Sequence, residues 1–283
     1  MADKKHNQDI RLVDAKDYPS ILSMIESSKD ASASLFLISA LRSSSPKLKV
    51  YAEYYDSQPV GTVVMLPNLP PFGVPVLLPA GTISSNLLRS IADVESSPQM
   101  ALGSVKPTST LAKIWPTKWD PLIAQREEIL LQQPSPFRIS KCSSLSTRLA
   151  VYEDIKALIK YRIAMEKDSG TAIVSTPSEA QKTITALIDQ QTLTIVEVHG
   201  EIGGCAAISA SDNQHEQLGF VYVEPKHRLL GVSDRLLSDI CINIHDRGKK
   251  PIAFTTCSGS LHNRLLNLGF KKIGEHLKVY FRS

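Results

Sequence analysis

One stretch of the sequence restricts the fold more than any other, and it runs from Val221 to Leu237. It begins as a strand-like run, Val221-Tyr222-Val223, that Glu224-Pro225 ends. It continues as a tight loop containing Gly231, and then enters a pattern of apolar residues at helical spacing. A strand that passes through a short glycine loop into a helix leaves several backbone N–H groups unpaired at the helix N-terminus. Those groups and the helix dipole favour an anion, typically a phosphate. The stretch therefore predicts α/β structure with an anion-binding loop.

The side chains of this loop suit the same purpose. Gly231 lets the backbone come close to a ligand, and Ser233 is small and can donate a hydrogen bond. Lys226, His227 and Arg228 would add positive charge beside the backbone amides.

The chain opens twice in a similar way, which predicts two copies of one unit. Ile10 to Leu22 and Thr147 to Ile159 each give a short strand, a turn, and an Asp that can cap an apolar-periodic helix. These two caps, Asp17 and Asp154, lie 137 residues apart. A Pro- and Gln-rich stretch at residues 132–136 is a natural linker between the copies. We therefore expect domains at residues 1–136 and 137–283.

Local patterns in both halves predict a mixed central sheet flanked by helices, an α/β (α+β) fold. The second half has the order β-α-α-β-β-β-α-β-α-β, with expected strands at 147–150, 193–198, 202–209, 216–223, 252–256 and 279–281. Its expected helices are 154–165, 178–189 (capped by Ser178), 231–247 and 261–268. In the first half we expect strands at 10–13, 49–55, 61–66, 74–78 and 100–105, and helices after Asp17 and at 86–94 and 119–131.

Composition excludes several classes of protein. The 283 residues are 42% hydrophobic and carry 32 Lys and Arg against 28 Asp and Glu, a net charge of +4 that is too small and too scattered to indicate nucleic-acid binding. The four cysteines form no pattern with metal-ligand spacing, so we expect reduced thiols and no metal. No apolar run resembles a signal peptide or a membrane span. We expect a soluble cytoplasmic or mitochondrial-matrix protein without a membrane partner, as a monomer or homodimer.

The loop motif Arg228-x-x-Gly231-x-Ser233 resembles the coenzyme A signature of the GNAT acetyltransferase superfamily, Arg/Gln-x-x-Gly-x-Gly/Ala. Ser233 departs from the third position but remains small. Downstream, Asn267-Leu268-Gly269-Phe270 resembles the family pattern Tyr-x-x-x-Gly-Phe, in which the Tyr protonates the departing thiolate. Leu265 stands where that Tyr is expected, and Ser258 stands where the family often has Asn. These departures leave the usual general acid in doubt.

A narrower resemblance is to the glycine N-acyltransferase family. It rests on residues 42–51, which look like the N-terminal domain of that family, and on residues 225–231, which look like its coenzyme A loop. The first half lacks an Arg-x-x-Gly-x-Gly loop, so it would be a degenerate GNAT-like domain that covers the acceptor side of the cleft.

The resemblance implies direct transfer of an acyl group, with acetyl the expected one, from acyl-coenzyme A as co-substrate to a small-molecule amine such as an amino acid. Coenzyme A would lie between two splayed parallel strands and bind backbone groups of Val221, Tyr222, Val223, Arg228, Leu229, Leu230, Gly231, Val232, Ser233 and Asp234. An amine acceptor must lose a proton, and Glu216 or His215 at the start of the central strand is the candidate base. His262 or Ser258 could replace the missing Tyr as proton donor.

Two other functions remain open from the sequence. The protein could acetylate a protein or peptide amine, which predicts an open groove in place of a covered cleft. It could also bind acyl-coenzyme A without catalysis, which the absence of the usual Tyr favours.

Overall fold

The computed structural model describes residues 8–43, 45–67, 74–93, 98–115, 121–132, 145–169, 173–257 and 259–281. The chain divides into two compact units. Unit 1 comprises residues 1–69, 74–127 and 274–283, and unit 2 comprises residues 70–73 and 128–273. The expected boundary between residues 136 and 137 lies outside the described residues and stays a prediction. The units are not two contiguous halves, because the last ten residues belong to unit 1.

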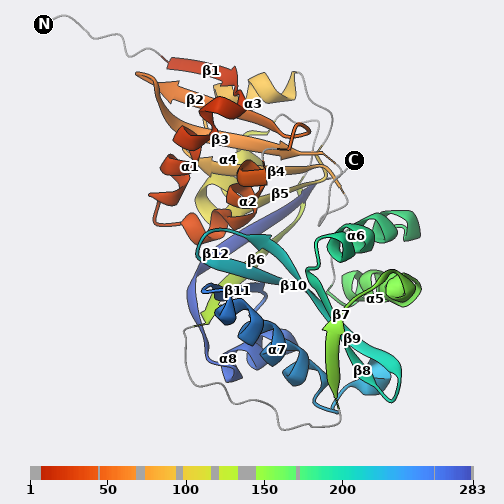
Figure 1. Ribbon diagram of the computed structural model, residues 1–283. Helices are drawn as coiled ribbons and strands as arrows, with labels where there is room; N and C mark the ends of the chain where they lie inside the picture. The colour runs from red at the N-terminus through yellow and green to blue at the C-terminus, as the bar shows by residue number, and fades with distance from the viewer. Residues whose placement is uncertain are drawn as a thin grey trace, which may run out of the picture. The chain divides into compact units, whose positions relative to one another are not determined.

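Unit 1 is built on a mixed sheet (Figure 1). Its strands, in spatial order, are β1 (Gln8–Leu12), β2 (Lys49–Tyr55), β3 (Gln58–Leu66), β4 (Val76–Gly81), β5 (Met100–Ser104) and the C-terminal part of β12 (Phe270–Phe281). Neighbours pair antiparallel except β4 and β5, which pair parallel. Asp56 and Ser57 close the hairpin between β2 and β3 with positive φ angles, as a two-residue turn requires.

Four α-helices accompany this sheet in the described part of unit 1: α1 (Tyr18–Glu26), α2 (Leu35–Ser43), α3 (Ser85–Ala92) and α4 (Val105–Ile114). Helices α3 and α4 bury Leu87, Ile91 and Leu111 against Val63 and Leu77 of the sheet. Burial of these side chains stabilises the unit, as does burial of Ile21, Leu35 and Leu41 on α1 and α2.

Unit 2 has a second mixed sheet. Its strands, in spatial order, are the C-terminal part of β6 (Pro121–Gln132), then β11 (Lys250–Thr255), β10 (His215–Val223), β9 (Glu201–Ser211), β8 (Leu193–Val198) and β7 (Ser146–Leu149). Only β10 and β11 pair parallel; the other neighbours are antiparallel.

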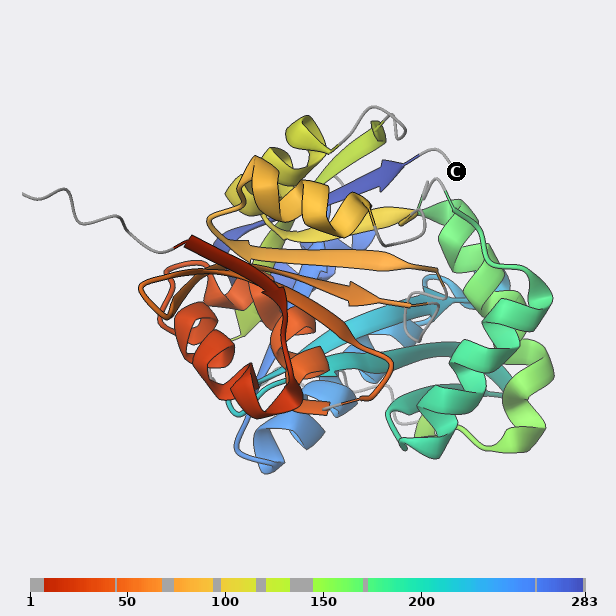
Figure 2. The same cartoon turned by 90° about the horizontal axis from the view of Figure 1, so that it is seen from above.

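Two pairs of helices cover opposite faces of this second sheet (Figures 1 and 2). Helices α5 (Ile155–Asp168) and α6 (Pro177–Asp189) pack over one face through Leu158, Ile184 and Leu187, together with Phe220 and Tyr222 of the sheet. Helices α7 (Val232–Asp246) and α8 (Ser260–Asn267) pack over the other through a cluster that contains Leu236, Ile240 and Leu265. The two faces therefore have separate cores.

Most elements of unit 2 follow the sequence prediction. The strand at 193–198 is found as expected, and the helix expected at 178–189 begins one residue earlier. Its N-cap is Thr176 and not Ser178, because Thr176 and Glu179 form a reciprocal capping box. Asp17 and Asp154 both stand at N-cap positions, but neither side chain caps its helix. Asp154 instead pairs with Arg148 at 2.7 Å and accepts from the Val151 amide.

The helix expected at 119–131 is wrong. Residues 121–132 form strand β6, which starts in unit 1 and ends in unit 2, and residues 119–120 lie outside the described part. The final strand, expected at 279–281, is much longer and crosses in the other direction, from unit 2 into unit 1. Each unit therefore contains a strand that continues from the other. No helix in the described part of the chain is long and apolar enough to span a membrane.

Candidate functional site

The two parallel strands of unit 2 separate after a short paired segment. Residues 215–218 of β10 pair with residues 250–253 of β11 and the ladder between them ends there. Beyond that point β10 pairs with β9, and β11 pairs with β6. Residues 219–223 of β10 thus lack a strand partner on the side that β11 leaves. An extended chain can add to such an edge through main-chain hydrogen bonds.

A β-bulge lies where the strands separate. Gly219 is opposite Ala207 and Tyr222 is opposite Cys205, so Phe220 and Val221 together face a single residue of β9. Phe220 adopts a positive φ of 46°, which is strained for a bulky residue. Its ring packs in the α5–α6 core and lies 5.6 Å from the guanidinium of Arg162. Bulges redirect backbone groups, so this one can aim an N–H into the space between the strands.

The loop after β10 exposes backbone amides. Leu229 and Gly231 have φ angles of 71° and 77°, and the first intrahelical bond of α7 runs from the Arg235 amide to the Gly231 carbonyl. Gly231 provides no side-chain cap, and Leu229 is 93% exposed. Within the described residues, no backbone carbonyl accepts from the amides of Leu229, Gly231, Val232, Ser233 or Asp234. These five amides are therefore not occupied by backbone carbonyls, whereas the Arg228 amide donates to the Pro225 carbonyl at 3.2 Å.

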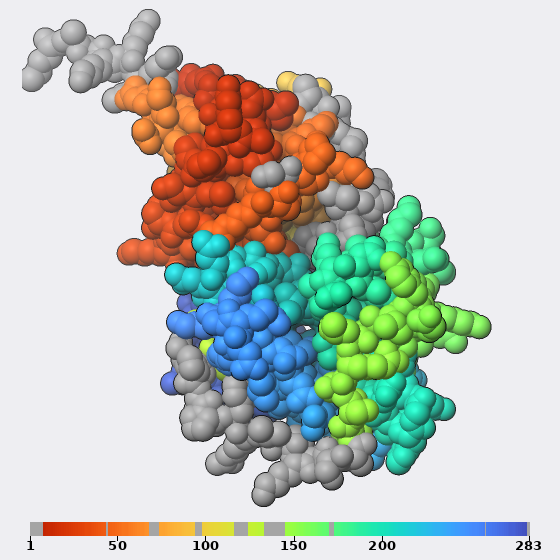
Figure 3. Space-filling view, viewed as in Figure 1, coloured from red at the N-terminus to blue at the C-terminus, as the bar shows by residue number. Residues whose placement is uncertain are grey.

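Val232 fixes the position of this loop. Its side chain is 1% exposed and packs with Val196, Val198 and Val223 on the sheet. Figure 3 shows the surface of α7 in blue beside that of α5 in green, with a narrow hollow between them. The open amides and the exposed position fit a phosphate or diphosphate without rearrangement of the helix.

The charged side chains of the loop are arranged differently from the expectation. Arg228 donates to Asp168 at 2.8 Å and to the Val223 carbonyl, and Lys226 donates to Glu201. His227 is not a solvent-facing cation beside the amides, because its side chain is buried within the 3-10 turn Pro225–His227. Arg228 is the predicted loop cation that combines exposure with a position next to the amides.

Acidic Asp234 lies in the first turn of α7, where it would repel a phosphate. Arg264 of α8 pairs with it at 2.8 Å and so compensates its charge.

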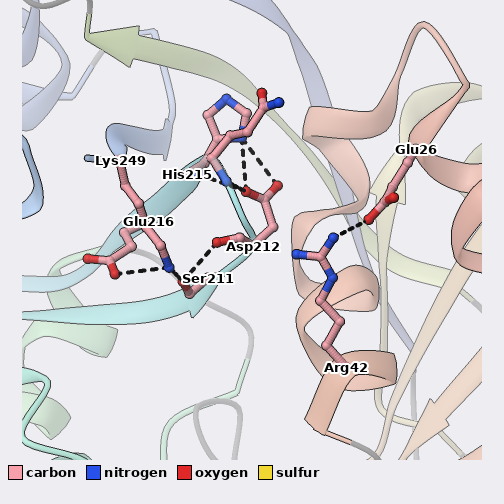
Figure 4. A network of polar contacts seen from close by, with 8 residues as sticks. Glu26, Arg42, Ser211, Asp212, His215, Glu216 and Lys249 are labelled. Carbon is pink, nitrogen blue, oxygen red and sulfur yellow. Dashed lines mark hydrogen bonds and ion pairs between the residues drawn. The ribbon is translucent and has the colours of Figure 1, made fainter. Parts of the chain in front are cut away.

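Glu216, a candidate base, is held by two cations. Its side chain is 9% exposed and pairs with Arg247, at the end of α7. It also pairs with Lys249 at 3.4 Å (Figure 4). Both carboxylate oxygens are therefore engaged, and the residue lies in the paired part of β10 on the α7 face. This geometry favours a structural ion pair and argues against the catalytic role, which stays a prediction.

We expect Glu216→Gln to lower stability by about 1–2 kcal/mol, because Arg247 and Lys249 lose their counter-charge. We expect kcat to change by less than about threefold, below 1 kcal/mol in activation free energy. Thermal unfolding and steady-state kinetics measure the two effects. Glu201→Gln, in the exposed Lys226 pair, is a control that should leave the melting temperature unchanged. A 100-fold lower kcat at an unchanged melting temperature would restore Glu216 as the base.

His215, the other candidate base, is paired within its own hairpin. Its Nδ1 lies 3.2 Å from both carboxylate oxygens of Asp212. Burial would raise the pKa of Asp212, but hydrogen bonds from the His215 ring and from the Gln214 and His215 amides hold it below its usual value. His215 is the first residue of β10, roughly 13 Å along the strand from Gly219 at about 3.3 Å per residue. The structure does not bring it to the separation of the strands.

His262 lies at the other strand. It is in the first turn of α8, just after the C-terminal end of β11, and its side chain is 8% exposed. Nε2 lies 3.7 Å from Glu128, whose position on β6 is opposite Thr255, the last residue of β11. Nδ1 is buried and makes no hydrogen bond within the described structure. His262 is thus a buried histidine with a carboxylate partner and one open ring nitrogen.

Leu265, which replaces the family Tyr, follows His262 by one helical turn on the same face of α8. It is fully buried in the α7–α8 core with Phe270. A donor at position 265 is therefore absent, and His262 is the nearest titratable group on that face of α8. Ser258, the other candidate donor, lies outside the described residues.

The sequence pattern did not indicate two residues that lie near the separated strands. Glu128 was assigned to a helix, so its pairing with His262 could not be seen. Gln217 is buried on β10 next to Glu216, and an uncharged amide in an alternating strand gives no sequence signal.

Unit 1 has a similar pair of parallel strands, but they are closed. Strands β4 and β5 pair only at Val76–Leu77 with Met100–Ala101. Beyond that, Gly103 approaches Pro79 so closely that a Cβ on Gly103 would lie 3.1 Å from the Pro79 carbonyl oxygen. The following helix is capped by Ser84, whose hydroxyl accepts from the Leu87 amide. Among the described residues, the close approach at Gly103 and the capped start of α3 differ from the corresponding strand and helix of unit 2, which agrees with a degenerate copy.

No cluster of three or more His, Cys, Asp or Glu that could hold a metal ion is present among the described residues.

Comparison with solved structures identifies the fold. The chain is similar to a GNAT-family acetyltransferase from Colwellia psychrerythraea (TM-score 0.58, 12% identity, 97% of this chain and 100% of the other). It is also similar to a tandem GNAT protein from the clavulanic acid biosynthesis pathway (TM-score 0.63, 10% identity, 98% of this chain and 98% of the other). A third similar structure is a GCN5-related N-acetyltransferase from Sphaerobacter thermophilus (TM-score 0.61, 14% identity, 98% of this chain and 95% of the other). The sequence matches no protein-family model and no curated protein.

These similarities define the class: the chain has the mixed α/β fold of GNAT acetyltransferases. Because the match to the tandem protein covers nearly all of both chains, the fold is the tandem form, with two GNAT-like units in one polypeptide.

Proposed function

We propose that unit 2 binds acyl-coenzyme A and transfers its acyl group, with acetyl the expected one, to the primary amine of a small molecule. One observation carries the proposal: the strand that loses its parallel partner continues directly into a loop with open amides. Together these features match a ligand with an extended amide-containing arm and a diphosphate. The GNAT-like fold supports the same chemistry. The narrower resemblance to glycine N-acyltransferases stays a prediction.

In this proposal the backbone of Val221, Tyr222 and Val223 pairs with the pantetheine arm. The amides of Leu229 and of Gly231 to Asp234 hold the diphosphate, and Arg228 lies beside them. A backbone N–H at the bulge polarises the thioester carbonyl, because it is fixed before the reaction begins.

The transfer step needs a proton donor for the leaving group. The amine nitrogen forms a bond to the carbonyl carbon, the carbon–sulfur bond breaks, and the amine loses one proton while the thiolate gains one. We assign the donor role to His262 through Nδ1, with Glu128 orienting the ring at Nε2. The chain offers this pair in place of the missing Tyr.

The test is a thiol-release assay with acetyl-, benzoyl- and octanoyl-coenzyme A against a panel of amines, combined with calorimetric binding of coenzyme A. We expect coenzyme A binding and amine-dependent thiol release, with His262→Ala lowering kcat and leaving the affinity for coenzyme A unchanged. Binding without release for any amine would favour the non-catalytic alternative. Release with a peptide and with no small amine would favour a peptide acceptor. An absence of binding would refute the proposal.

A further inference from the structure

Unit 2 contains four buried side-chain polar atoms that lack a hydrogen-bond partner within the described structure: Gln217 Oε1, His227 Nε2, Ser238 Oγ and His262 Nδ1. His227 faces Glu201 at 3.8 Å, and Ser238 lies inside helix α7. The other two lie beside the separated strands, one on β10 and one just after β11. His262 already has a proposed role, whereas Gln217 has none.

Gln217 faces the opposite side of the sheet from Glu216. Side chains alternate along a strand, and its neighbours Glu216 and Leu218 both point to the α7 side. Gln217 therefore points to the side that α5 and α6 cover. It lies two residues before Gly219, the first residue without a β11 partner, and is 5% exposed.

A carboxamide oxygen at this position accepts a hydrogen bond but cannot take up a proton. An N–H donor on a ligand is the natural partner for it, because a buried acceptor left unpaired disfavours the empty site. The amide N–H groups of the pantetheine arm and the acceptor amine both bring such donors, and the amine is the one that must come up to the thioester carbonyl carbon.

Titratable groups on the elements packed against β10 do not supply a free base. On α5, Arg162 pairs with Glu166 at 2.6 Å, and Glu166 also accepts from Ser175. Burial raises the pKa values of Tyr161, Cys205 and Tyr222, so these groups stay protonated near neutral pH.

Glu224, directly after β10, interacts with Tyr161 and Tyr222 on the α5 side of the sheet. The other charged groups named here are cations or are paired. Across the sheet, Glu216 is held by Arg247 and Lys249, and Lys250 at the start of β11 is a cation. His215 at the start of β10 pairs with Asp212.

We propose that Gln217 positions the acceptor amine by accepting a hydrogen bond from it, and that the acceptor is a weakly basic amine that arrives unprotonated. This inference rests on the proposed function and narrows its substrate class. Arylamines and hydrazides are neutral at pH 7, whereas an alkylamine resembles lysine, with a pKa of about 10.4, and is almost fully protonated. The proton is lost from the amine to water after attack, and the amide of Gln217 stays neutral throughout.

The matched probes are aniline and benzylamine, which differ by one methylene and strongly in basicity. With acetyl-coenzyme A at pH 7, we expect kcat/KM for aniline to exceed that for benzylamine by at least about tenfold, and benzylamine turnover to rise with pH as the free amine forms. Benzylamine turnover equal to that of aniline at pH 7 would overturn the inference about basicity.

Three variants test the residue itself. Gln217→Leu should raise the KM for aniline by at least about tenfold with the KM for acetyl-coenzyme A unchanged. Gln217→Glu should raise benzylamine turnover at pH 7 and add an enzyme ionisation to the pH profile, because a carboxylate can accept the proton. Gln132→Leu is the matched control: Gln132 is also buried, but its amide donates to the Leu268 carbonyl and faces His245 at 3.3 Å.

Stability separates a substrate-binding amide from a structural one. We expect Gln217→Leu to melt at or above the wild-type temperature, since it removes an unpaired polar atom, and Gln132→Leu to melt lower. If Gln217→Leu had the wild-type KM for aniline and still transferred acetyl groups, the role of Gln217 would be refuted and the proposed function would stand. Failure of the wild-type chain to bind coenzyme A would refute the proposed function and this inference with it.

Discussion

Replacing Ser233 by glutamate should weaken acyl-coenzyme A binding about 100-fold while the protein stays folded. Ser233 lies in the first turn of α7, among the amides that no carbonyl occupies. An acidic residue in a first helical turn is favoured by the helix dipole, by about 0.3–1 kcal/mol, so the variant should be at least as stable as the wild type. A diphosphate bound to the same amides would meet a like charge at close range.

Two unit charges about 4 Å apart repel by about 4 kcal/mol at an effective dielectric constant near 20. After screening by solvent, we expect Kd for coenzyme A to rise by about 100-fold, a difference of about 3 kcal/mol. Isothermal calorimetry gives the affinity, and thermal unfolding confirms the fold.

The control for this experiment is Ser233→Gln, because glutamine has nearly the same size as glutamate and carries no charge. It should weaken coenzyme A binding much less than the glutamate does. If Ser233→Glu bound coenzyme A as tightly as the wild type, the diphosphate would not lie at the N-terminus of α7.

The second large effect concerns stability, and it comes from a buried ion pair in unit 1. Glu127 on β6 is 6% exposed, receives a hydrogen bond from Lys278 of β12 at 2.6 Å, and lies 3.4 Å from Nδ1 of the fully buried His276. Lys278→Met should destabilise the protein by about 3–5 kcal/mol at pH 7, because a buried carboxylate then loses its cation. Chemical unfolding followed by fluorescence measures the loss.

The double variant Glu127→Gln/Lys278→Met provides the control, because it removes the charge together with its partner. We expect it to recover most of the stability lost in the single variant. Equal stability of the wild type and Lys278→Met would show that the pair contributes nothing.

The same group makes stability depend on pH. Burial by itself would raise the pKa of Glu127, but the charge of Lys278 and the contact with His276 outweigh it and lower the pKa from 4.5 to about 2. Burial lowers the pKa of His276 from 6.5. In both cases the unfolded chain binds protons more readily, so stability falls as pH falls. This dependence follows His276 below about pH 6.5 and Glu127 between about 4.5 and 2.

The sequence predicted unit 2 well because its signals are local. Alternation identifies β8 at Leu193–Val198, and Gly269 follows Leu268, the C-cap of α8. The glycine and the helix start that follows it are local signals, so the open amides around Gly231 could be predicted, whereas the packing of Val232 on Val196 and Val198 could not.

Elements that depend on distant partners were harder to predict. Residues 121–132 contain many helix-forming residues, yet they form strand β6 because Glu128 to Leu131 pair with β11. Only the end of β12 was predicted, since its earlier part is rich in lysine and contains Gly274. The positions of Glu216 and His262 were predicted, but their partners Lys249 and Glu128 come from other elements, and a sequence does not show which charges meet.

The crossing of β6 and β12 between the units has a consequence for how the chain matures on the ribosome. Strand β5 is fully buried and borders β12 through residues 276–280, which are synthesised only after all of unit 2. Until then a nascent unit 1 presents a bare apolar strand edge, the kind of surface that recruits chaperones or joins another chain. Completion of the first unit is thus tied to translation of the second.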